Sequence, residues 1–303
     1  MKLRPEQFEN SDQLPNFQVG YHVVCVLDLL GQRSALAGWD TMPEESGPSP
    51  EMLYAIKQTA GTVLAFRDMF HNYFRELQKP TVSTSFLNSV PSHQKELYLR
   101  ARQTRLSSQQ FSDTFVFYAP LSTTHGDVTL LPVLGIFIAC AWSMIVGLGT
   151  QIPFRAGVCI GTGIELSPQN FYGPGLATAH HLESCVAKHP RIVVSKKLCD
   201  LLRRPSKFSD DPTINLIMAN TAKACAAFLT DDVDGHVILD YLGEEFRKYA
   251  EHFPVDFGSF VNAAVAFADL QQQRFHNSKD FKVANYYHRL LEYLQPRQAD
   301  WQT

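Results

Sequence analysis

The stretch YHVVCVLDLLG, residues 21–31, decides the fold that we expect for this chain. Residues 22–27 form a Val-rich run in which polar and apolar side chains do not alternate, which is typical of a short buried strand. Asp28 ends this strand, and open α/β sheets bind their ligands at the carboxyl ends of strands. A carboxylate in such a place is hydrogen-bonded, ion-paired or bound to a metal. Asp28 is therefore either a structural residue or part of a functional site.

Further strand and helix patterns follow along the chain. Residues 111–119 (FSDTFVFYA) predict a second strand, with Asp113 near its start. Residues 154–163 (FRAGVCIGTG) predict a third strand, which enters a Gly-containing turn. The Gly-Pro-Gly turn of residues 173–175 opens a predicted helix, and residues 191–195 (RIVVS) predict another strand.

In this order the pieces resemble the catalytic domain of class III nucleotidyl cyclases. That family has a strand ending in Asp-Ile-x-Gly, a hairpin with a second Asp, an Arg-x-Gly-Ile strand, a Tyr/Phe-Gly turn before a helix that ends near Leu-Glu, and an Ile-x-Val-Ser strand. The corresponding pieces here are Asp28-Leu29-Leu30-Gly31, Asp113, Arg155-Ala156-Gly157-Val158, Tyr172-Gly173-Pro174, Leu182-Glu183 and Ile192-Val193-Val194-Ser195. The resemblance covers about residues 18–205 and implies an α+β fold with a ferredoxin-like cyclase core, an antiparallel-rich sheet flanked by helices.

The rest of the chain predicts a helical extension. Residues 203–212 are polar, contain two Pro and are interpreted as a linker. Beyond them, helical patterns cover about residues 257–275 and 279–294. We therefore expect a cyclase-like catalytic domain over residues 1–205 and a mostly helical C-terminal extension over residues 206–303.

The resemblance implies a two-metal site. It assigns Asp28 and Asp113, helped by the backbone carbonyl of Leu29, as ligands of two Mn²⁺ or Mg²⁺ ions that serve in-line phosphoryl transfer. The attacking group in that family is the ribose 3′-OH, pyrophosphate leaves, and the product is a 3′,5′-cyclic nucleotide. Binding of the triphosphate is assigned to the turn after the first strand, formed by Leu30, Gly31, Gln32 and Arg33. Arg155 is interpreted as a structural residue at a strand edge.

Other positions depart from the family pattern. Gln109 stands where purine cyclases carry a Lys that helps to read adenine, and Asn170 stands where a base-reading residue starts the Tyr-Gly turn. Both are candidate substrate-binding residues. Ala177 and His181 replace an Asn and an Arg that stabilise the transition state. His181 is a candidate catalytic residue that donates to phosphate, or else a packing or surface residue.

Three functions follow from these departures. The chain looks like bacterial pyrimidine cyclases of the Pycsar type, which make antiphage second messengers; on this interpretation UTP is the first choice of substrate, giving cyclic UMP, and CTP is the second. Alternatively, it is a degenerate cyclase-homology module that binds a nucleotide or a partner without turnover. Adenylate or guanylate cyclase activity is a third interpretation. The resemblance also implies a homodimer with active sites at its interface.

Composition restricts partners and location. A net charge of −3 over 303 residues gives no general case for nucleic-acid binding. Residues 130–148 are apolar enough to suggest a membrane span, but their Pro and Gly residues and weakly charged flanks favour a buried helix, so we expect no stable membrane insertion. Six Cys without a CxxC pair and an N-terminus without an apolar signal core predict a cytoplasmic protein with buried, reduced thiols.

One segment imitates a calcium loop. Residues 230–241 (TDDVDGHVILDY) carry Asp232, Asp234 and Gly235 at suitable positions. The first ligand position is a Thr and the closing Glu position is a Tyr, so the segment predicts a turn before a strand instead.

Overall fold

The computed structural model describes residues 19–32, 47, 49–76, 104–122, 128–167, 170–204, 210, 212–251 and 253–302. The strands are β1 (Val19–Leu29), β2 (Ser107–Phe111), β3 (Thr114–Pro120), β4 (Phe154–Ser167), β5 (Asn170–Tyr172), β6 (Ile192–Val194), β7 (Leu229–Asp231) and β8 (Val237–Leu239). The α-helices are α2 (Pro50–Glu76), α5 (Leu131–Gly149), α6 (Pro174–His181), α7 (Lys196–Arg203), α8 (Pro212–Ala227), α9 (Glu244–Ala250), α10 (Phe257–Asn277) and α11 (Phe281–Gln298). A π-helix (Leu182–Ala187) continues α6, and a 3₁₀ turn (Ala299–Trp301) follows α11.

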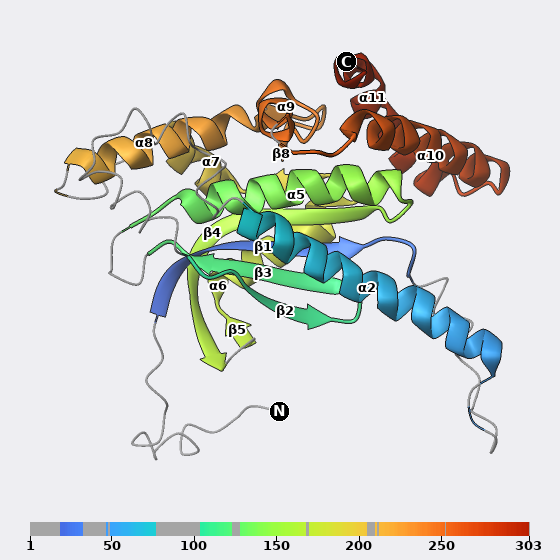
Figure 1. The fold of residues 1–303 in the computed structure, drawn as a ribbon, viewed down its shortest axis with the longest axis horizontal. Coiled ribbons are helices and arrows are strands. Elements are labelled where there is room, and N and C mark those ends of the chain that lie inside the picture. The colour runs from blue at the N-terminus through green and yellow to red at the C-terminus, as the bar shows by residue number, and fades with distance from the viewer. Residues whose placement is uncertain are drawn as a thin grey trace.

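One mixed sheet contains all of these strands. Its order is β2-β3-β1-β4-β6-β8-β7, and β5 pairs with the end of β4 (Figure 1). The central strand β1 is antiparallel to both neighbours, β3 and β4, whereas β4 and β6 are parallel. The prediction of an α+β fold with a sheet flanked by helices and further helices at the C-terminal end is confirmed, and the sheet is mixed because β4 and β6 are parallel.

The strand β1 is buried on both faces because each face of the sheet is covered. Val23, Cys25 and Leu27 belong to the larger hydrophobic core, while Val24 and Val26 belong to a smaller core on the opposite face. This alternation is the period of two that side chains follow along a strand. It explains why the run lacks the polar positions of a half-exposed strand.

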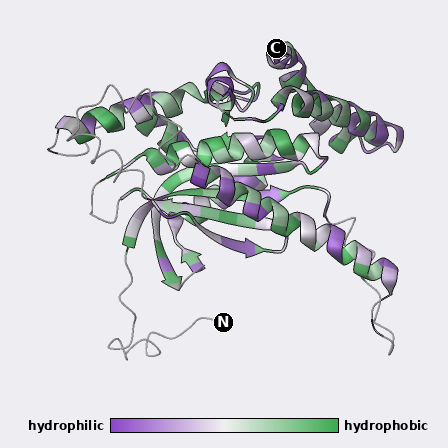
Figure 2. Ribbon diagram, viewed as in Figure 1, coloured by the Kyte–Doolittle hydropathy of each residue, from purple (hydrophilic) through white to green (hydrophobic). Residues whose placement is uncertain are grey.

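Helices α2 and α5 cover the first face (Figure 1). A stripe of aromatic residues on α2 packs on β3, where Phe70 stacks on Phe117 with ring centroids 3.8 Å apart. Helices α8 and α10 pack in turn on α5, which is why 15 of its 19 residues are buried. Figure 2 shows α5 as a largely hydrophobic helix lying inside this stack.

Helix α5 is also the one helix in the described ranges that is long and apolar enough to cross a membrane. Its burial between the sheet and the outer helices confirms the prediction of a buried core helix at residues 130–148. The buried side chains of α5 are not available to lipid, so stable membrane insertion is not plausible. The structure is consistent with a soluble protein. Five of the six cysteines are buried free thiols, and Cys185 is exposed.

On the second face, α6 and the π-helix lie directly on β4. The contact is close because Gly157 has no side chain: a Cβ there would lie 2.4 Å from the carbonyl oxygen of Ala179 and 2.7 Å from the backbone nitrogen of Glu183. Such distances are below van der Waals contact, so the helix would have to move away from the sheet.

We expect Gly157→Ala to lower the free energy of unfolding by about 1–3 kcal/mol, because the added methyl group overpacks the contact between helix and sheet. Urea denaturation followed by circular dichroism measures the change. Gly61→Ala in α2 is the matched control: its Cβ would meet nothing within 4 Å, and removing an exposed mid-helix Gly should stabilise by about 0.5–1 kcal/mol. Equal effects of the two substitutions would contradict the close packing at Gly157.

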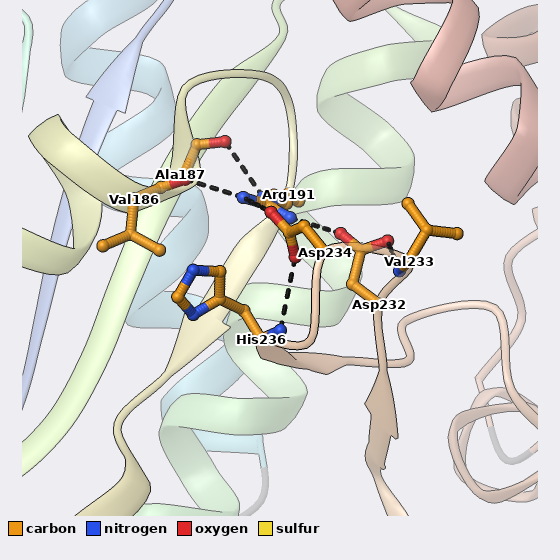
Figure 3. Close-up of polar contacts among 7 residues, drawn as sticks. All are labelled: Val186, Ala187, Arg191, Asp232, Val233, Asp234 and His236. Carbon is orange, nitrogen blue, oxygen red and sulfur yellow. Dashed lines mark hydrogen bonds and ion pairs between the residues drawn. The ribbon is translucent and has the colours of Figure 1, made fainter.

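The C-terminal residues are continuous with the rest of the fold. The β7–β8 hairpin extends the sheet beyond β6, and the turn between its strands contains Gly235 in a left-handed conformation, with φ of 80°. The prediction of a turn before a strand at residues 230–241 is thus confirmed. The carboxylates of Asp232 and Asp234 bind the guanidinium of Arg191, the residue directly before β6 (Figure 3). A functional division of the chain at residue 205 stays a prediction.

Candidate active site at the end of β1

The structure brings the two candidate metal-binding aspartates together. Asp113 lies in the tight turn of the β2–β3 hairpin, and the next residue, Thr114, pairs in register with Asp28 on β1. The backbone N–H of Leu29 donates to the carbonyl oxygen of Asp113 at 3.1 Å. Two residues that are far apart in sequence thus become neighbours because β1 and β3 pair antiparallel with this register.

The carboxylate of Asp28 has two partners. The hydroxyl of Thr114 donates to Oδ1 at 2.7 Å, and Nη2 of Arg155 donates to Oδ2 at 3.2 Å. Arg155 lies opposite Asp28 on the other neighbouring strand, β4. Asp28 and Arg155 keep about a fifth and a quarter of their side-chain surface exposed. The site is therefore reachable from solvent. Arg155, interpreted from the sequence as structural, pairs directly with this candidate ligand.

A second carboxylate, that of Glu183, forms an ion pair with Arg155. Nε of Arg155 lies 2.7 Å from Oε1 of Glu183, whose side chain is only 3% exposed. Burial raises the pKa of Glu183, and the charge of Arg155 opposes that rise. Glu183 stands in the π-helix, the second residue of a segment whose wider helical turn is rare and often found at functional sites.

An open pocket of about 650 Å³ adjoins Asp28 on this face. It is lined by Val26, Phe111, Thr114, Val116, Tyr172, Gly173, Pro174, Leu176, Ala177 and His180. Thr114 connects the two features, since it lines the pocket and donates to Asp28. These described walls are mainly apolar and include no Asp, Glu, Lys or Arg, and Phe111 and Tyr172 at the rim are more than 60% exposed.

The turn after β1 was assigned to phosphate binding from the sequence. Leu30 and Gly31 form a turn in which Gly31 is left-handed, with φ of 89°. The N–H of Leu30 already donates to the carbonyl oxygen of Pro153 at 2.8 Å. Gln32 is half-buried at the end of this turn, and Arg33 lies outside the described residues.

The two candidate base readers lie at the rim of the same face. The side-chain oxygen of Gln109 accepts a hydrogen bond from the backbone N–H of Phe171 at 3.0 Å, so Gln109 ties β2 to β5. Asn170 is exposed at the first position of β5. Neither side chain lines the pocket, although Phe111 and Tyr172, two residues away from each, do.

The candidate catalytic residue His181 is exposed at the last position of α6. The neighbouring His180 lines the pocket, and His181 does not. Sequence reasoning selected His181 and not His180, and the catalytic role of His181 stays a prediction. It also did not select Thr114 or Glu183 as site residues, although Thr114 follows Asp113 directly and Glu183 belongs to the Leu-Glu piece of the resemblance.

The donor atoms present suit Mg²⁺ or Mn²⁺. Both cations prefer oxygen ligands, and Asp28 and Asp113 carry carboxylates at the same end of β1 and the β2–β3 hairpin, where the backbones of Leu29 and Asp113 are hydrogen-bonded. Within the described ranges no three His, Cys, Asp or Glu side chains gather in a metal-binding group. Cation binding here would therefore depend on these two carboxylates, on backbone oxygen and on the substrate, and Asp28 would have to release Arg155.

Comparisons with known proteins assign this chain to no family. No protein-family model matches the chain, and no curated protein matches it.

Proposed function

We propose that this protein is a nucleotidyl cyclase, which converts a nucleoside triphosphate into a 3′,5′-cyclic nucleotide and pyrophosphate. The observation that carries the proposal is the pairing of Asp28 with Thr114, which brings Asp28 and Asp113 together beside a pocket of about 650 Å³. Two adjacent carboxylates at a cleft suit the binding of divalent cations for phosphoryl transfer. The ferredoxin-like cyclase core belongs to the same proposal, supported by a central β1 between antiparallel β3 and β4.

Each residue has a defined task in this proposal. Asp28 and Asp113, with the carbonyl of Leu29, hold the cations, and Thr114 orients the Asp28 carboxylate through its hydrogen bond. Bound Mg²⁺ or Mn²⁺ supplies activation of the 3′-OH and neutralises the triphosphate charge. Leu30, Gly31 and Gln32 of the turn after β1, together with Arg33, would bind the phosphates, and His181 would donate to them from the end of α6.

The apolar pocket favours an uncharged base held by contact and stacking. Phe111 and Tyr172 provide aromatic surface at its rim, and the polar side chains in its wall are those of Thr114 and His180. Because no Asp, Glu, Lys or Arg is among the described residues of the wall, base recognition differs from the Lys-assisted reading of adenine. We propose UTP as the preferred substrate and CTP as the second, with the protein acting as a cytoplasmic homodimer that makes an antiphage second messenger.

The test is incubation of the full chain with each of the four nucleoside triphosphates and Mn²⁺, with products separated by chromatography. We expect cyclic UMP as the main product, cyclic CMP as the second, and no product after chelation of the metal. Cyclic AMP or cyclic GMP as the main product would replace the pyrimidine proposal with a purine cyclase. No cyclic product from any substrate would overturn the cyclase proposal.

A specific observation favours the second candidate, a degenerate nucleotide-binding module. The Asp28 carboxylate is already ion-paired with Arg155, and Ala177, at the position of a transition-state group in the family, has no polar side chain. Such a protein would bind a nucleoside triphosphate, measured by calorimetry, without converting it.

A further inference from the structure

One guanidinium is shared by two carboxylates at the candidate site. Nη2 of Arg155 donates a hydrogen bond to Oδ2 of Asp28 at 3.2 Å, and Nε lies 2.7 Å from Oε1 of Glu183 in an ion pair. This group comprises two carboxylates and one guanidinium, so its formal net charge is one negative unit. The negative net charge favours binding of a divalent cation at Asp28 and Asp113. Arg155 opposes that binding, because it is paired with an oxygen of Asp28.

We propose that Glu183 is a positioning residue for cation binding: it keeps Arg155 bound when Asp28 gives its oxygen to the divalent cation. This inference rests on the cyclase proposed above. The pair between Arg155 and Glu183 then substitutes for the pair between Arg155 and Asp28, and the guanidinium is not left without a counter-ion. Without Glu183, Asp28 is the one carboxylate among the described residues that pairs with Arg155, and the arginine competes with the cation for it.

The position of Glu183 is fixed by the backbone around it. The close contact of the helix with Gly157 places the backbone nitrogen of Glu183 directly over β4, the strand that carries Arg155. Its side chain is 3% exposed, whereas that of Asp28 is 19% exposed. A buried carboxylate on a fixed backbone keeps its place while the more exposed one exchanges partners. Removing one partner of such a pair leaves a charge uncompensated, which is why the exchange matters energetically.

The experiment measures Mn²⁺ affinity by the electron paramagnetic resonance signal of free Mn²⁺, with the full chain and no nucleotide. We expect Glu183→Gln to weaken Mn²⁺ binding about 10-fold, a coupling within the usual range for interacting residues. Glu183→Asp should recover part of the affinity, and Arg155→Gln should strengthen binding. In the Arg155→Gln background, Glu183→Gln should change the affinity by less than about 3-fold, because Glu183 acts through Arg155.

Glu165→Gln is the matched control. Glu165 is another carboxylate on β4, ten residues beyond Arg155, where it accepts a hydrogen bond from Tyr118 at 2.9 Å. It should leave Mn²⁺ affinity unchanged. In turnover, Glu183→Gln should raise the KM for Mn²⁺ about 10-fold while kcat at saturating Mn²⁺ stays within about 3-fold, which a merely unstable protein would not show.

The outcomes separate the two proposals. An equal loss of affinity from Glu183→Gln with and without Arg155, or no loss, overturns the positioning role and leaves the cyclase proposal in place. Wild-type protein that binds no Mn²⁺, or whose Mn²⁺ binding survives Asp28→Asn, overturns the metal site and the inference with it.

Discussion

Asp28→Asn is expected to lower cyclase turnover by at least about 10³-fold, since losing a metal-binding carboxylate removes several kcal/mol of transition-state stabilisation and each 1.36 kcal/mol is a factor of ten. The fold should survive. An asparagine oxygen can still accept the hydrogen bond from Thr114, and Arg155 keeps its ion pair with Glu183. The loss should therefore appear in kcat and in Mn²⁺ affinity, and not in the thermal unfolding curve.

The matched control for this substitution is Asp269→Asn in α10. Asp269 is an exposed carboxylate whose hydrogen bond comes from Gln273 on the same helix. It removes the same charge from the chain far from the candidate site, and turnover should stay at the wild-type level. Asp113→Asn should reproduce the loss seen for Asp28→Asn. If Asp28→Asn remained active, neither the metal assignment nor the proposed mechanism could stand.

The sequence predicted the central features of the fold because they follow from local patterns. A continuous apolar run identified β1, and the Pro- and Gly-flanked apolar segment identified α5 as a buried helix. Ser195 shows how local such features are: it lies directly before α7, and its side chain caps that helix by accepting from the N–H of Leu198 at 3.2 Å. Each of these depends on residues close together in the chain.

The contacts that shape the candidate site could not be predicted in this way. Asp28 meets Thr114 across 86 residues and Arg155 across 127, so both contacts depend on strand register, which the sequence did not give. The π-helix that carries Glu183 was expected as the end of an ordinary helix, because an apolar pattern does not distinguish one extra residue in a turn. The pocket is likewise made by five separate elements.

Arg191→Met is expected to lower the free energy of unfolding by about 3–5 kcal/mol, the usual cost of removing one partner from a buried ion pair. The Arg191 side chain is 5% exposed and binds four groups (Figure 3). Nε donates to the carbonyl of Ala187 at 3.0 Å and Nη2 to that of Val186 at 2.7 Å, while the guanidinium also pairs with Asp232 and Asp234. One side chain thus joins the π-helix to the β7–β8 hairpin.

Guanidinium chloride or urea denaturation measures this loss, and Lys196→Met is its control. Lys196 forms an ion pair with Asp200 on exposed α7, and deleting it should cost less than about 1 kcal/mol. Burial would raise the pKa of Asp234, but the hydrogen bond and charge of Arg191, together with the backbone N–H of His236, outweigh that effect and hold the pKa below its ordinary value. The stabilisation is therefore present at neutral pH and is lost as the pH falls through the lowered folded-state pKa. In strong acid, the free energies of unfolding of wild type and Arg191→Met should approach each other. If Arg191→Met lowered the free energy of unfolding at neutral pH no more than Lys196→Met does, Arg191 would not hold the hairpin in place.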